Sequence, residues 1–143
     1  MERGIFRCPS QWLPFLPPQV RCPSLRELSV PNWEFLALTP EGAHTACGIQ
    51  LRCKCLLLPG DCPVRTTAPA VISYGLSARD SLTLSGVRQP VLCIQRTLPG
   101  PGGTPLEPQE IPLGDLPGPP EALLGLLGLR LLLMPLTKAL FLE

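Results

Sequence analysis

The densest group of reactive side chains lies between residues 44 and 62. It contains five candidate zinc ligands: His44, Cys47, Cys53, Cys55 and Cys62. Zinc takes four nitrogen or sulfur ligands in a tetrahedron, so the group is large enough. The closely paired C-x2-C spacing that is typical of structural zinc sites is absent. We therefore favour free, reduced thiols and predict no metal, and a zinc- or thiol-dependent adaptor through residues 44–62 stays open as an alternative.

The cysteines also argue against a disulfide framework. There are seven, and an odd number together with the lack of a convincing signal peptide does not fit a stapled secreted domain. Two of them stand in the tetrapeptide RCPS, which occurs at residues 7–10 and again at 21–24. The flanking residues do not repeat, and structural repeats need longer units and more copies. We interpret the repetition as an accident of composition.

No pattern predicts an enzyme. The chain has a single histidine, and no serine stands in a nucleophile-elbow context. No GxxxxGK[ST] or GxGxxG segment is present to cradle a phosphate. The arginines of residues 1–98 are dispersed and form no basic stripe with interleaved aromatics. We therefore predict no catalytic residue, no cofactor, no small-molecule substrate and no nucleic-acid partner.

The backbone that must carry these side chains is rich in residues that break regular structure. The 143 residues include 20 Pro and 13 Gly, and only 5% are aromatic. This composition predicts a mostly irregular chain of low order, beginning with a proline-rich irregular segment at residues 1–47. Residues 48–98 alternate apolar and polar side chains in short runs, which predicts a weak, small antiparallel β meander. Residues 99–120 hold eight Pro and five Gly, which is typical of a linker.

Residues 121–143 are predicted to form one leucine-rich α-helix. Such a helix is apolar on every side, so it should be buried in a partner, in its own kind or in a membrane. Its eleven leucines favour membrane insertion by about 3 to 7 kcal/mol, and Arg130 opposes insertion by about 2.5 to 3.5 kcal/mol. The segment matches L-x-x-L-L twice, so the predicted binding residues are Leu123, Leu126, Leu127, Leu129, Leu132 and Leu133.

The function predicted from the sequence is therefore binding without catalysis. The C-terminal helix would attach the chain to a membrane surface or to the hydrophobic groove of a partner protein. The abundance of Arg, Pro, Gly and Leu, with few Lys and one Asn, also fits a reading-frame product without a selected biochemical function. The sequence assigns no compartment; it favours an intracellular one, with membrane association through the helix.

Overall fold

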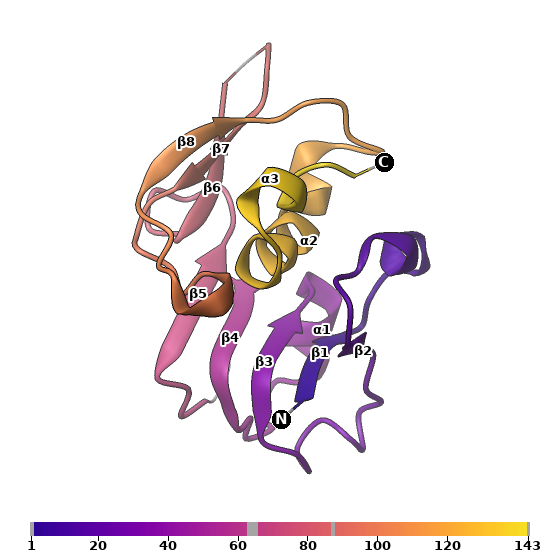
Figure 1. The fold of residues 1–143 in the computed structure, drawn as a ribbon. Helices are drawn as coiled ribbons and strands as arrows, with labels where there is room; N and C mark the ends of the chain where they lie inside the picture. Colours follow the sequence, from indigo (N-terminus) through magenta and orange to yellow (C-terminus); the bar gives the residue numbers. More distant parts are fainter. Residues whose placement is uncertain (1, 63–65, 87, 143) are drawn as a thin grey trace.

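Eight strands pair edge to edge in the order β2-β1-β3-β4-β5-β6-β7-β8 in the computed structural model, which describes residues 2–62, 66–86 and 88–142 (Figure 1). The strands are β1 (Glu2–Phe6), β2 (Val20–Arg21), β3 (Trp33–Leu38), β4 (Cys53–Pro59), β5 (Ala70–Tyr74), β6 (Leu82–Ser85), β7 (Val91–Ile94) and β8 (Gln109–Pro112). The helices are α1 (Pro40–Thr45), α2 (Pro120–Leu133) and α3 (Leu136–Ala139), with 3-10 turns η1 (Ser10–Phe15) and η2 (Pro101–Gly103).

The sheet is mixed. Strands β1 to β6 run parallel to one another, and β7 pairs antiparallel with both β6 and β8. The pairing of β5 with β6 rests on a single pair of residues, Tyr74 with Leu82. The order β2-β1-β3-β4-β5 is that of doubly wound α/β sheets, in which ligands bind outside the carboxyl ends of the strands.

The expectation of a mostly irregular chain with a weak antiparallel segment is wrong. Residues 1–47 supply β1 and β3 to the parallel half of the sheet, and residues 99–120 supply the edge strand β8. The sequence WEFLAL of β3 is buried on both faces of the sheet, so it shows no alternation of apolar and polar residues. Most prolines fall in connections or at strand ends, where they remove no hydrogen bond from the ladder.

The middle of the chain forms strands where the alternation predicted them, but their pairing differs from a meander. Among the strands described within residues 48–98, β4, β5 and β6 pair parallel, and β6 and β7 pair antiparallel. Two parallel strands that follow each other in the chain need a connection that returns to the starting edge of the sheet, so no tight turn joins β4 to β5. Local patterning reveals strands but does not set their direction.

Two apolar layers cover the sheet. On one face α2 lies across the strands (Figure 1). Its leucines pack on side chains such as Phe35, Leu57 and Ile72. Residues that alternate with these, such as Leu36 and Leu56, point to the opposite face and pack with α1. The leucine-rich segment therefore finds its apolar partner within its own chain.

Two glycines let α2 lie close to the strands. A Cβ atom at Gly125 would lie 3.0 Å from the Tyr74 ring, and one at Gly128 would lie 2.9 Å from Leu82. Glycine in a helix is unfavourable by about 1 kcal/mol relative to alanine, so its presence here is explained by this close approach. The pair serves helix–sheet packing.

Candidate functional site

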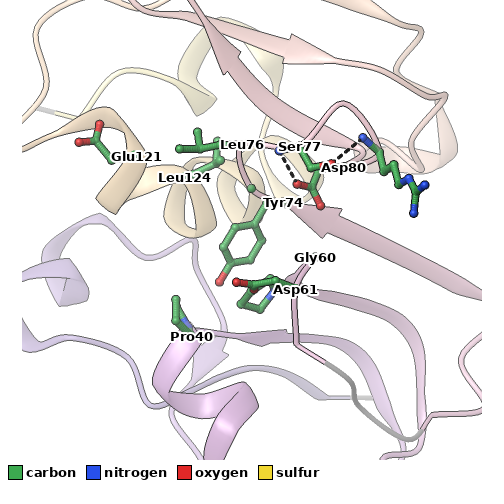
Figure 2. Close-up of a pocket in the computed structure, with 12 residues that line it drawn as sticks. Pro40, Gly60, Asp61, Tyr74, Leu76, Ser77, Asp80, Glu121 and Leu124 are labelled. Carbon is green, nitrogen blue, oxygen red and sulfur yellow. Dashed lines mark hydrogen bonds between the residues drawn. The ribbon is translucent and has the colours of Figure 1, made fainter.

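A cleft of about 630 Å³ opens at the carboxyl ends of β4 and β5 (Figure 2). Its apolar lining comes from Pro40 at the start of α1, Pro59 at the end of β4, Tyr74 at the end of β5, and Leu124 in α2. Cavities that hold small ligands span about 300 to 1,000 Å³. The cleft therefore has the size of a ligand site, and it lies outside the carboxyl ends of two parallel strands.

The buried carboxylate of Asp80 forms one wall of this cleft. Asp80 is only 5% exposed, and its Oδ2 accepts a hydrogen bond of 3.1 Å from the Ser77 amide (Figure 2). Within the described residues, Oδ1 accepts no hydrogen bond, and no Arg or Lys forms an ion pair with Asp80. Oδ1 is not one of the fully buried polar atoms that lack a partner, so it is positioned to accept a donor from a ligand in the cleft.

Two glycines make room for this carboxylate. Gly60 follows β4 and Gly75 follows β5, and a Cβ atom at Gly60 would overlap Oδ1 of Asp80. A Cβ atom at Gly75 would lie 2.5 Å from Oδ2. The parallel pairing of β4 with β5 brings the two glycines side by side, so the carboxylate lies against backbone at the ends of both strands.

The turn that carries Asp80 is fixed from several sides. The Asp80 amide donates to the Ser77 carbonyl at 3.1 Å, which closes the turn. The side-chain amide of Gln95 donates to the carbonyls of Asp80 and Ala78 at 2.6 Å and 3.3 Å. The Ser81 amide donates to Ser73 Oγ at 3.2 Å. These bonds hold the carboxylate in place before any ligand arrives.

The charges around the cleft are mostly negative. Asp61, Asp80 and Glu121 contribute three carboxylates, and Arg79 contributes the one guanidinium among the described lining residues. Glu121 lies in the first turn of α2, where its charge complements the positive end of the helix dipole. The remaining field therefore favours a cation.

Tyr74 supplies an aromatic wall and no free hydroxyl. Its hydroxyl donates to the Leu38 carbonyl at 2.7 Å, and its ring is buried beneath α2. Burial, and after it the neighbouring Cys62 and Asp61, raise the pKa of the Tyr74 phenol above its usual value. The phenol therefore stays protonated and hydrogen-bonded to the backbone, and the aromatic ring lines the cleft.

The structure does not bring the five candidate zinc ligands to one point. His44 and Cys47 are exposed at the end of α1, Cys53 contacts the Thr66 hydroxyl, and Cys55 packs beneath α2. Cys62 donates to Asp61 Oδ1 at 3.6 Å. Among the described residues, no three His, Cys, Asp or Glu side chains are grouped so that they could hold a metal ion.

The six leucines of the predicted binding helix are covered by the sheet. Leu123, Leu126, Leu127, Leu129 and Leu132 are buried in the main core, and Leu133 is half-buried against it. No helix in the described part of the chain is long and apolar enough to cross a bilayer, and α2 has 14 residues. Membrane or groove binding through these leucines stays a prediction, and it requires α2 to leave the sheet.

The cleft was not predicted from the sequence, and its local signals are short. They are a glycine after each of two apolar runs and the segment Ser77-x-x-Asp80, in which a side chain closes a turn. No family model matches the chain, and no curated protein or solved structure is significantly similar to it.

Proposed function

We propose that this protein binds a small organic amine in the cleft at the carboxyl ends of β4 and β5, without catalysing a reaction. The observation that carries the proposal is Asp80, a carboxylate that is 5% exposed and fixed by its turn, with no cationic partner in the described chain. A protonated amine supplies both the charge and the N–H donor that Oδ1 lacks.

The chemistry of the carboxylate selects the head group of the ligand. A hydrogen bond between an ammonium group and a carboxylate is about twice as strong as one between neutral groups. It contributes about 1.5 to 3 kcal/mol, which corresponds to roughly 10- to 150-fold in affinity. An anionic ligand would instead meet the carboxylates of Asp61, Asp80 and Glu121.

The apolar lining selects the body of the ligand. Pro40, Pro59, Tyr74 and Leu124 present carbon surface to the cleft, and burial of apolar area contributes about 25 cal/mol per Å². The Tyr74 ring adds a surface over which a cation is attracted. An aryl or alkyl amine satisfies both parts of the site.

The residue types that line the cleft favour binding over catalysis. Among the described lining residues there is no histidine, cysteine or lysine. The Ser77 hydroxyl accepts a hydrogen bond from the Arg79 amide at 3.1 Å, and the Tyr74 hydroxyl is committed to Leu38. No hydroxyl of the site therefore has a base that would activate it as a nucleophile.

Calorimetric titration with benzylamine and with its neutral analogue benzyl alcohol tests the proposal. We expect benzylamine to bind and benzyl alcohol to bind at least about tenfold more weakly, since the alcohol lacks the charge. Asp80→Asn keeps an oxygen for the Ser77 amide but removes the charge, so it should weaken benzylamine about 10- to 100-fold. Equal affinity of the wild type and Asp80→Asn would contradict the proposal, as would no binding of benzylamine.

Asp115→Asn is the matched control. Asp115 is an exposed carboxylate that does not line the cleft. Its variant carries the same change in net charge and should bind benzylamine like the wild type. A loss of affinity in this control would mean that the overall charge of the protein, and not the buried carboxylate, attracts the amine.

A further inference from the structure

A second hollow adjoins the cleft that contains Asp80. It has a volume of about 490 Å³ and lies between the turn that joins β6 to β7 and the start of α2. Leu76 and Glu121 line both the cleft and this second hollow, so the two spaces meet at these side chains. Figure 2 shows Asp80 and Glu121 at opposite ends of the group of residues that line the cleft.

The walls of the second hollow are mostly apolar. Leu84 of β6, Pro90 before β7 and Pro120 at the start of α2 are half-buried and present carbon to it. Glu121, at the junction, is the one charged residue among its described lining residues. Beyond the junction the second hollow is therefore suited to hydrocarbon and not to a charged group.

Leu76 links these apolar walls to the carboxylate. It stands in the chain between Gly75, which packs against Oδ2 of Asp80, and Ser77, whose amide donates to the same oxygen. The Leu76 side chain is 71% exposed and lines both spaces. A carbon chain that starts at the carboxylate and passes this leucine enters the second hollow, and it removes the apolar surface of Leu76 from water.

On the basis of the proposed function, in which Asp80 binds the ammonium group, we propose that the ligand is a long-chain alkyl amine whose hydrocarbon tail lies in the second hollow. The ammonium group occupies only the end of the cleft near Asp80, and the chain crosses the junction beside Leu76. Each methylene group that becomes buried against the apolar walls raises the affinity by up to about fourfold.

Glu121 is the one feature that favours a different ligand, a diamine with a second ammonium group at the junction. Glu121 is exposed, so an ion pair with it would contribute little to affinity. Its charge also already complements the positive end of the α2 dipole. The apolar walls beyond it therefore decide in favour of an uncharged tail.

Calorimetric titration with butylamine, hexylamine and octylamine tests the tail. We expect the affinity to rise along this series, by about 10- to 100-fold in total, because the added methylene groups become buried. Equal affinities for butylamine and octylamine, with both weakened by Asp80→Asn, would overturn the tail and leave the amine site intact. Octylamine binding that Asp80→Asn does not weaken would contradict the amine site itself, and the tail proposal with it.

Octamethylenediamine separates the two kinds of ligand. It has the same chain length as octylamine and carries a second ammonium group at the far end. We expect it to bind at least about fivefold more weakly than octylamine, because the second charge would lose water against apolar walls. Equal or tighter binding of the diamine would overturn the proposal and would assign the second ammonium group to Glu121.

Two variants locate the tail. Leu84→Asn places a polar side chain in the second hollow only, so it should weaken octylamine about fivefold and leave butylamine unchanged. Leu76→Asn changes an exposed residue, which the fold tolerates, and should also reduce the preference for octylamine over butylamine. Leu25→Asn, at an exposed leucine outside both spaces, is the control and should keep the wild-type preference. A wild-type preference in both Leu76→Asn and Leu84→Asn would overturn the proposal.

Discussion

The guanidinium of Arg130, near the end of α2, donates a hydrogen bond to the main-chain carbonyl of Phe15, a residue 115 positions earlier in the chain. Its remaining N–H groups donate to the carbonyls of Ala139, Lys138 and Phe141 at 2.7, 3.1 and 3.0 Å. One side chain that is 7% exposed thus joins η1, α2 and α3. The arginine that opposes membrane insertion in the sequence serves in the structure to satisfy the carbonyls of the C-terminal turn.

Arg130→Met should destabilise the protein strongly. The substitution keeps much of the apolar stem but leaves four carbonyls without their donor, and we expect a loss of about 3 kcal/mol or more in the free energy of unfolding. Urea denaturation measures the change. Arg96→Met, at an exposed arginine, is the control and should stay within about 0.5 kcal/mol of the wild type. Similar stability of the two variants would contradict the assigned role of Arg130.

Leu126→Ala should also be strongly destabilising. Leu126 is fully buried between α2 and the sheet, and removal of a buried leucine side chain leaves a cavity that lowers stability by about 2 to 5 kcal/mol. Leu13→Ala is the matched control, because Leu13 is 53% exposed. If the two alanine variants unfold at the same urea concentration, α2 does not pack on the sheet as described.

Gly60→Ala should disturb the cleft specifically. The added Cβ would overlap the Asp80 carboxylate, and we expect a loss of about 1 to 3 kcal/mol in stability together with weaker benzylamine binding. Gly114→Ala is the control, since a Cβ atom at Gly114 meets nothing within 4 Å. A Gly60→Ala protein with wild-type stability and affinity would show that Asp80 does not lie against this glycine.

Stability should fall as the pH rises above 9. Burial raises the pKa of the Cys55 thiol from 9.0 to about 12, so the folded state keeps a proton that the unfolded state loses between these values. The stabilisation is complete below pH 9 and is lost as the pH rises toward 12, at up to about 1.4 kcal/mol per pH unit. Urea denaturation in reductant, repeated at several pH values, should show that the free energy of unfolding falls less steeply with pH in Cys55→Ala. The same fall as in the wild type would contradict the role given to the Cys55 thiol. Leu57→Ala, which removes no titrating group, should keep the wild-type slope.

The native protein should not float with lipid vesicles. The leucines of α2 are buried against the sheet, so binding through them requires the helix to separate from the core. In a sucrose gradient with anionic phospholipid vesicles we expect the folded chain in the protein fraction and not with the lipid. Recovery of the folded wild type with the vesicles would show that α2 leaves the sheet readily and would favour membrane attachment.

The sequence predicted elements better than it predicted their arrangement. Alternation placed strands close to β4, β5, β6 and β7, and the helix predicted from residue 121 begins at Pro120 in the structure. Strands β1 and β3 were missed because they are buried on both faces and therefore lack alternation. The apolar helix was interpreted as needing an outside partner because sequence periodicity cannot show that the chain supplies its own sheet.

For a similar reason, the sequence alone does not predict the cleft. Asp80 in the sequence is one carboxylate of a polar turn, and Gly60 and Gly75 resemble ordinary turn residues. Only the parallel pairing of β4 with β5 brings the two glycines together, and only the return of the chain into β6 places Asp80 against them. Contacts between segments distant in the chain decide the site, and no local pattern records them.

A nitrogen–proton correlation spectrum recorded during titration with benzylamine tests the central claim most directly, because it locates the ligand as well as detecting it. We expect the amide signals of Gly60, Gly75 and Ser77 to shift together with one dissociation constant, and to shift far less when benzyl alcohol is added at the same concentration. Shifts centred elsewhere, or equal responses to the amine and the alcohol, would contradict a cleft in which Asp80 holds a cation.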